Sequence, residues 1–274
     1  MCAVYSFYAK YCDGTIVREE LESHVNSMIS KIRISSKLRG FLSRIGLEEE
    51  VFEAALKIAI SFHDIGKAFF QDNLVRAKTK DCSKTERMRP IEYLSFLGHE
   101  FLSTCMLHET LNNSTVMQVE GDQWNYGFEY IKGSILFSVL YHHHALAFRE
   151  REFEILSEKK SASMLDDGSI HYLSSMLEKH LGSDISARFE EALSSLDSEP
   201  VVTKTCLQDV AREINPFEKQ RTRYISVKSA ASLNRLLLSY LLVLDNLSAM
   251  ESRKGRHLTP YMRAIQAFNR YYLE

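Results

Sequence analysis

Apolar residues recur along most of the chain at positions i, i+3, i+4 and i+7, the spacing typical of amphipathic helices. Over residues 18–32 this pattern places Leu21, Val25 and Met28 on one face, with His24 beside it. Further helices are predicted over residues 47–70, 91–111, 129–150 and 226–250. Only 11 Gly and 4 Pro interrupt the chain, so strands should be few. We therefore expect an all-α protein.

The segments between these helices are more polar. Residues 1–17 are predicted to be irregular, and residues 71–90 form a polar stretch that ends at Pro90 and is typical of an exposed loop. Residues 149–200 are rich in charge and serine and carry none of the chemistry described below. We expect one domain over residues 1–274, in which about 150–200 is either a family-specific helical insertion or a small helical subdomain.

The overall charge gives no sign of a nucleic-acid partner, because the net charge is -2 and the pI is near 6.6. Two local stretches are basic, namely residues 31–44 and 219–228. Each is interpreted either as a solvated face or loop, or as a surface that follows a nucleic-acid backbone. Neither stretch establishes such a partner by itself.

The cysteines and the apolar runs indicate in which compartment of the cell the protein is found. The five cysteines are scattered and include no CxxC pair, which argues against a disulfide framework and against a zinc–thiolate knuckle. The N-terminus lacks the pattern of a signal peptide. The most apolar run, Leu236–Leu247, is too short to span a bilayer. We expect a cytoplasmic protein with no membrane contact.

The segment AISFHDIGKAFF carries the first candidate chemistry, because it inserts His63, Asp64 and Lys67 into an apolar run. A buried charge needs a partner or a metal ion. If this segment is helical, His63 and Asp64 flank one cation and Lys67 projects one turn further on, near the same end. Imidazole and carboxylate ligands favour transition ions over Mg²⁺.

Possible partners occur at other apolar-to-polar transitions. His99 follows Gly98, three histidines at residues 142–144 follow VLY, and Asp245 interrupts the strongest apolar run. Any one of these side chains is more often an ordinary hydrogen-bonded residue. Their joint occurrence predicts a shared site.

In this order, these residues resemble the HD metal-dependent phosphohydrolase superfamily. The strings HDIGK at residues 63–67, GHE at 98–100 and DNLSA at 245–249 further resemble the HD nuclease of type I CRISPR interference systems. No GxxxxGK[ST] loop of a helicase is present, so the form encoded as a separate chain is the closer match. The resemblance covers about residues 15–150 and 225–255.

The resemblance implies an HD-domain helical bundle in which metal ligands converge from several helices on two divalent ions, Mn, Fe, Co or Ni rather than Mg. It implies one ligand set of His24, His63, Asp64 and Asp245, and a second of Asp64, His99, His142 and His143. Asp64 would bridge the two ions. The alternative pair in the histidine run is His143 with His144.

The resemblance also implies an activity, namely hydrolysis of single-stranded DNA, first internally and then progressively, by a metal-activated water. Asp64 and Lys67 would be the catalytic residues, with Lys67 stabilising the phosphate charge. A separately encoded helicase and an RNA-guided surveillance complex would be the partners. Two alternatives remain: a phosphohydrolase of nucleotides or cyclic nucleotides, and a non-catalytic metal-binding module in a larger complex.

Overall fold

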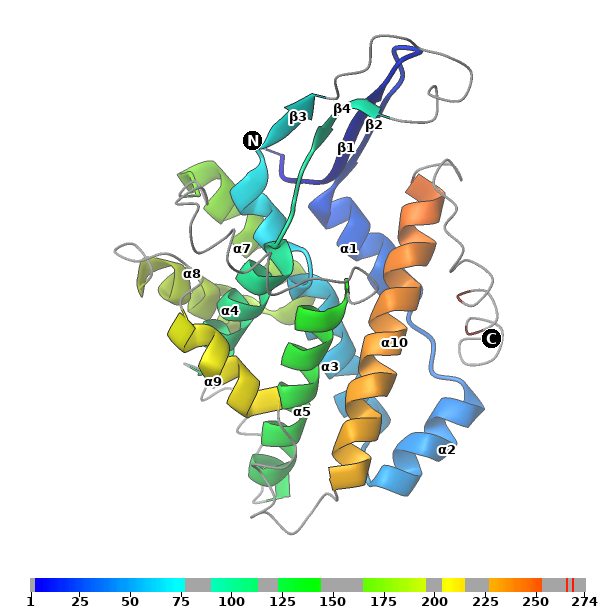
Figure 1. Ribbon diagram of the computed structural model, residues 1–274. Coiled ribbons are helices and arrows are strands. Elements are labelled where there is room, and N and C mark those ends of the chain that lie inside the picture. The colour runs from blue at the N-terminus through cyan, green and yellow to red at the C-terminus, as the bar shows by residue number, and fades with distance from the viewer. Residues whose placement is uncertain are drawn as a thin grey trace.

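A computed structural model places a small sheet at one end of a helical body (Figure 1). It describes residues 3–76, 90–112, 123–143, 165–195, 204–214 and 227–252, together with Ile265 and Phe268. His144 and most of the second basic stretch, residues 219–226, lie outside the described residues.

Helices make up most of the described chain, as the periodicity predicts. The α-helices are α1 (Leu21–Ser30), α2 (Ser36–Ile45), α3 (Glu49–Phe62), α4 (His99–Asn112), α5 (Gln123–Tyr141), α7 (Asp167–Leu181), α8 (Ser183–Ser195), α9 (Lys204–Ile214) and α10 (Val227–Ser252). A 3-10 helix, η1 (Ile65–Phe70), follows α3 after two residues. None of the helices in these ranges is long and apolar enough to cross a membrane.

The expectation of a purely all-α protein is wrong, because four strands form an antiparallel sheet in the order β2-β1-β4-β3. The strands are β1 (Tyr5–Tyr11), β2 (Ile16–Glu20), β3 (Leu74–Arg76) and β4 (Pro90–Leu94). A turn at Asp13-Gly14 joins β1 to β2, and Gly14 takes a left-handed φ of 80°. Asp-Gly is a strong hairpin signal, so the first residues are not the irregular segment that we expect from the sequence.

The predicted helix over residues 91–111 is also partly wrong. Its first residues form β4, and the helix α4 begins only at His99. Gly98, with a φ of 83°, separates the two elements, and the Ser95 amide donates a hydrogen bond to the Asn73 carbonyl beside β3. Strand pairing with β1 and β3 therefore decides the conformation of these residues.

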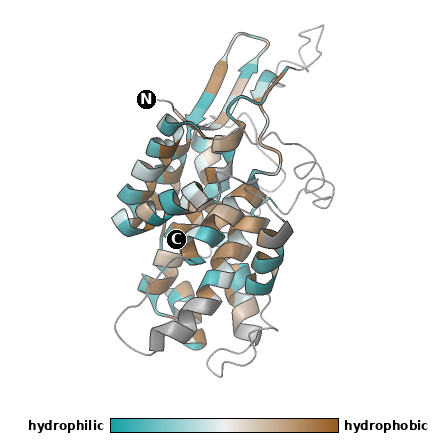
Figure 2. Cartoon of the chain, turned by 90° about the vertical axis from the view of Figure 1, so that its left-hand side faces the viewer, coloured by the Kyte–Doolittle hydropathy of each residue, from teal (hydrophilic) through white to brown (hydrophobic). Residues whose placement is uncertain are grey.

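The hydrophobic core is organised around α3, which contacts α1, α5, α7 and α10. Its Phe62 ring packs edge-on against Phe189 of α8 at 6.2 Å, and its Phe52 ring packs against Tyr240 of α10 at 5.5 Å. These rings are almost completely buried, and such pairs add about 0.5–1.5 kcal/mol to the burial itself. Figure 2 shows hydrophobic positions gathered where helices face one another.

Helices α7 and α8 fall within the segment that we interpret as an insertion or subdomain. Their residues Leu173, Leu177 and Phe189 belong to the same core cluster as α3 and α10. In addition, the Glu22 amide of α1 donates a hydrogen bond to the Tyr172 hydroxyl. Removing α7 and α8 would therefore expose the core instead of detaching a separate module.

The spacing of the cysteines does not predict a disulfide that the structure contains. Cys105 of α4 and Cys206 of α9 form a disulfide across a sequence separation of 101 residues. The scattered cysteines argue against a disulfide framework, but this pair does form a bond because α4 and α9 pack side by side. Long-range packing of this kind leaves no mark in the local sequence.

Candidate metal centre

The HD segment is not the continuous helix that the sequence predicts. Helix α3 ends at Phe62, Asp64 adopts φ −111° and ψ 2°, and η1 then begins at Ile65. Gly66 permits η1 to pack closely against α4, because a Cβ at this position would lie 2.1 Å from the His99 carbonyl oxygen. The Gly66 amide also donates a hydrogen bond of 2.8 Å to the Ser103 hydroxyl. This close approach of η1 to α4 brings His99 next to Asp64.

Three histidines share one backbone arrangement. In each, ring atom Nδ1 lies within hydrogen-bonding distance of the carbonyl oxygen three residues earlier: 2.7 Å for His63, 2.6 Å for His99 and 2.6 Å for His142. A carbonyl can only accept, so Nδ1 must carry the proton and a neutral ring then presents the lone pair of Nε2. Histidine ligands of metal ions are commonly oriented in this way.

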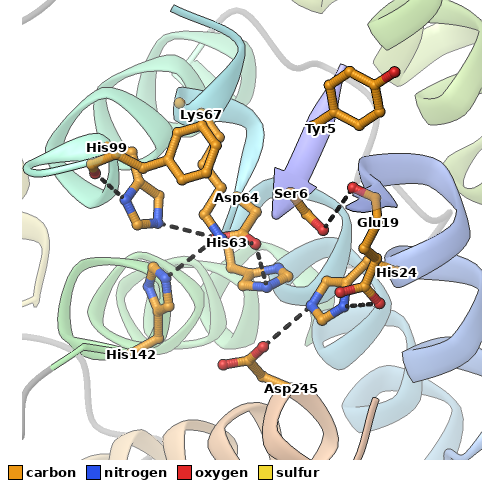
Figure 3. Close-up of polar contacts among 12 residues, drawn as sticks. Tyr5, Ser6, Glu19, His24, His63, Asp64, Lys67, His99, His142 and Asp245 are labelled. Carbon is orange, nitrogen blue, oxygen red and sulfur yellow. Dashed lines mark hydrogen bonds and ion pairs between the residues drawn. The ribbon is translucent and has the colours of Figure 1, made fainter. Parts of the chain in front are cut away.

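The three Nε2 atoms converge on the Asp64 carboxylate (Figure 3). The distances are 3.0 Å from His99 to Oδ1, 3.7 Å from His142 to Oδ1, and 3.4 Å from His63 to Oδ2. The Nε2 atoms of His63 and His142 are buried and have no hydrogen-bond partner. Burial lowers the pKa of His63 to about 4, so a proton does not satisfy that nitrogen at neutral pH.

These contacts fit a metal ion. A ring nitrogen without a proton and a carboxylate oxygen repel each other at this distance unless a cation lies between them. Nitrogen and oxygen ligands about 2.0–2.2 Å from one ion, at right angles, are themselves about 3 Å apart. The donor set is therefore suited to a divalent ion, and His63, His99 and His142 all offer a free Nε2 to it.

A second part of the site is built around His24 of α1. Its Nε2 lies 3.1 Å from Asp245 Oδ1 on α10, and its Nδ1 lies 3.1 Å from Glu19 Oε1 at the end of β2. Burial lowers the pKa of His24, but hydrogen bonds with Asp245 and Glu19 outweigh it and raise the value to about 9. The Ser248 hydroxyl lies 3.2 Å from the same Nδ1. Glu19 is a site residue that sequence reasoning misses.

All eight predicted site residues meet in this one region, and Figure 3 labels each of them except His143. Two groups have ligand atoms within 4.8 Å of one another, and both include Asp64: one with His99, His142 and His143, the other with His24 and His63. Asp245 joins the second group through His24. The structure thus brings together the residues of each ligand set that the resemblance implies, and their role as ligands stays a prediction.

Lys67 lies against the shared carboxylate, with Nζ 2.6 Å from Asp64 Oδ2. Burial alone would raise the pKa of Asp64, but the charges of His63 and Lys67 hold it well below its usual range. Burial would also raise the pKa of Asp245, but the hydrogen bond from His24 outweighs this effect and lowers the pKa. Both carboxylates are therefore ionised and able to bind a cation.

Solvent reaches the site through only part of its lining. His24, His63, Asp64, His99 and His142 are each at most 4% exposed. The Asp245 side chain is 21% exposed, and His143 is also partly exposed. A ligand that approaches the site would therefore meet Asp245 and His143 first.

A third group, His108, Glu109 and Cys206, also has ligand atoms close together. Cys206 is bonded to Cys105, so it presents no thiolate there. We assign no metal to this group.

No protein-family model, curated protein or solved structure matches the chain.

Proposed function

We propose that this chain is a metal-dependent nuclease that hydrolyses phosphodiester bonds of single-stranded DNA. The observation that carries the proposal is the convergence of three buried histidine Nε2 atoms, each with Nδ1 held by a backbone carbonyl, on the carboxylate of Asp64. A carboxylate shared by two groups of potential ligands is the arrangement expected of a two-metal phosphodiesterase.

The proposed ligands fall into two groups around Asp64, with His24, His63 and Asp245 on one side and His99, His142 and His143 on the other. Five imidazoles and two carboxylates favour Mn²⁺, Fe²⁺, Co²⁺ or Ni²⁺ over Mg²⁺, which prefers oxygen ligands. When bound, two such ions lower the pKa of a water molecule and stabilise the charge on the phosphate oxygens.

The side chains of this chain supply orientation and charge. Glu19 holds His24 so that Nε2 points toward Asp245. Backbone carbonyls orient His63, His99 and His142 so that their Nε2 atoms point toward Asp64. The Lys67 ammonium, beside Asp64, would balance charge that develops on the phosphate. The partly exposed Asp245 and His143 mark the side from which a phosphodiester would approach.

The biological setting follows from the resemblance. We propose that the nuclease acts in the cytoplasm as the separate-chain HD component of a type I CRISPR interference system. Its partners would be a separately encoded helicase and an RNA-guided surveillance complex that open the DNA. The strings HDIGK, GHE and DNLSA support this setting.

The test is cleavage of circular single-stranded DNA by protein stripped of metal with a chelator, with Mn²⁺, Co²⁺, Ni²⁺ or Mg²⁺ added back. The proposal predicts nicking with the transition ions, weaker nicking with Mg²⁺, and none with Asp64→Asn. Nucleoside triphosphates and cyclic nucleotides are offered in parallel. Hydrolysis of these alone would replace the proposal with a nucleotide phosphohydrolase, and tight metal binding without any turnover would replace it with a non-catalytic metal-binding module.

A further inference from the structure

A pocket of about 520 Å³ lies between α2 and the first half of α10. Helix α2 contributes one face, which includes Lys37, Phe41 and Arg44 at spacings of four and three residues. Helix α10 contributes Ser232, Arg235 and Ser239, which also share one face, and the Phe268 ring completes the lining. We call this the α2–α10 pocket.

The charge of the α2–α10 pocket is entirely positive. Lys37, Arg44 and Arg235 line it, and no acidic residue does. The sequence of α2 contains no acid, and that of α10 contains none before Asp245. The side chains of all three cations are exposed, and among the described residues no ion pair is found for Arg44 or Arg235.

Two other cations of the same basic stretch have acidic partners. Arg39, on the opposite side of α2, lies 2.6 Å from Glu49, and Lys31 lies 2.8 Å from Glu251. Arg44 and Arg235, the two pocket cations for which no ion pair is found in the described part of the chain, thus face the same pocket. This distribution favours a specific anion site over a uniformly solvated basic face.

Two further features of the pocket suit a phosphodiester. Ser36 and Lys37 form the first turn of α2, where backbone amides have no partner within the helix and the helix dipole favours an anion. The Phe41 ring, half-buried in the lining, offers a flat apolar surface next to these charges. Cations interleaved with aromatic rings are typical of sites that bind single-stranded nucleic acid.

We propose that the α2–α10 pocket binds a backbone segment of single-stranded DNA outside the metal centre. The identity of this ligand rests on the proposed function. Arg235 and Asp245 are ten residues apart on α10, which is about 15 Å along the helix axis, and they lie on different faces. A strand held in the pocket must therefore extend over several nucleotides to reach the metal centre, so the pocket selects for longer strands.

The experiment measures DNA binding in the presence of a chelator, so that it does not depend on cleavage. A labelled oligothymidylate of about 20 nucleotides, longer than the ~4–16 nucleotides that a single-strand site covers, is titrated with the full chain by fluorescence anisotropy. The test variant is Arg44→Ser with Arg235→Ser. The control is Arg39→Ser with Arg212→Ser, which removes the same charge from exposed ion pairs elsewhere.

The proposal predicts that the pocket variant raises Kd by about tenfold or more and reduces the slope of log Kd against log salt by about 1.4, that is, two phosphate contacts. The control should change Kd by less than about twofold. Equal weakening in both variants would overturn the proposal, because it would indicate general electrostatic attraction.

Competition separates a strand site from a small-anion site. Inorganic phosphate and thymidine monophosphate are added to the wild-type complex, and neither should displace the oligonucleotide at millimolar concentration. Displacement by either would overturn the strand proposal in favour of a nucleotide or phosphate site. Metal-dependent cleavage is also measured at limiting DNA concentration. If the pocket variant cleaves as efficiently as the wild type, the pocket does not bind the DNA strand, while the proposed function remains intact.

Discussion

The Glu19 carboxylate accepts a hydrogen bond of 3.1 Å from Nδ1 of His24, whose opposite ring nitrogen lies 3.1 Å from Asp245. Both Glu19 and His24 are buried, so this contact is not weakened by solvent. It fixes the ring so that Nε2 faces the candidate metal centre, and it makes Glu19 a positioning residue that does not itself contact the ion.

Replacement of Glu19 with glutamine should therefore weaken metal binding without unfolding the chain. Loss of such an outer partner typically lowers metal affinity by about 10–100-fold. The measurement is Mn²⁺ affinity by titration calorimetry, alongside thermal unfolding. Glu20→Gln is the matched control, because Glu20 is the next residue and its side chain is exposed. If both variants bind Mn²⁺ like the wild type, Glu19 does not position His24.

The stability of the metal-free protein should pass through a maximum near pH 6.5. The pKa of His24 is raised from 6.5 to about 9, so its contribution is complete below pH 6.5 and is lost as pH rises through 9. The pKa of His63 is lowered to about 4, so the unfolded chain binds a proton more readily than the folded chain and stability falls as pH falls from 6.5 toward 4. Each of these two changes in pKa corresponds to roughly 3 kcal/mol.

Urea unfolding in the presence of a chelator is measured from pH 4 to pH 9. It checks the predicted loss of stability on both the acid and the alkaline side of the maximum. His24→Asn should remove the decline between pH 6.5 and 9 while keeping the decline at lower pH. A decline on the alkaline side that persists in this variant would show that another group causes it.

Substitution of Lys67 with methionine should reduce cleavage far more than metal binding. The ammonium lies 2.6 Å from Asp64 and is 8% exposed, and loss of one group that stabilises developing charge costs about 100–1000-fold in kcat. The control is Lys57→Met, which removes a partly exposed cation that pairs with Glu53 on α3. Single-turnover cleavage and Mn²⁺ titration are measured together. A parallel loss of Mn²⁺ binding in Lys67→Met would indicate a structural ion pair.

A methyl group at position 66 should disrupt both the fold and the site. The Cβ of Gly66→Ala would lie 2.1 Å from the His99 carbonyl oxygen and 2.9 Å from the Leu102 side chain. The backbone of η1 or α4 must then move, which should cost at least about 1–3 kcal/mol and displace His99 from Asp64. Gly40→Ala is the control, because a Cβ there meets nothing within 4 Å and alanine favours the helix by about 0.5–1 kcal/mol. Chemical unfolding of both variants provides the comparison.

The sequence predicts the long helices well because their apolar periodicity reflects one continuous buried face. The helix predicted over residues 226–250 is observed as Val227–Ser252, and the first amphipathic helix is observed as Leu21–Ser30. The break after Phe62 and the close approach of Gly66 to His99 are not predicted, because the apolar periodicity runs on through Phe62 and Gly66. Strand β4 depends on its pairing with β1.

The residues of the candidate site are predicted, but not the contacts that orient them. Histidine, aspartate and lysine stand out in apolar segments, so His63, Asp64 and Lys67 can be found from their chemistry alone. Glu19 lies in an ordinary acidic stretch, and only the junction of β2 with α1 brings it to His24. The carbonyl contacts of the histidine rings likewise arise where each helix begins or ends.

The most direct test of the account is the number of Mn²⁺ ions bound per chain, measured by titration calorimetry on chelator-treated protein. The account predicts two ions for the wild type and less than one for Asp64→Asn, because Asp64 belongs to both groups of ligands. Thermal unfolding checks that the variant remains folded. Absence of Mn²⁺ binding by the wild type, or the same number of ions in a folded Asp64→Asn protein, would contradict the account.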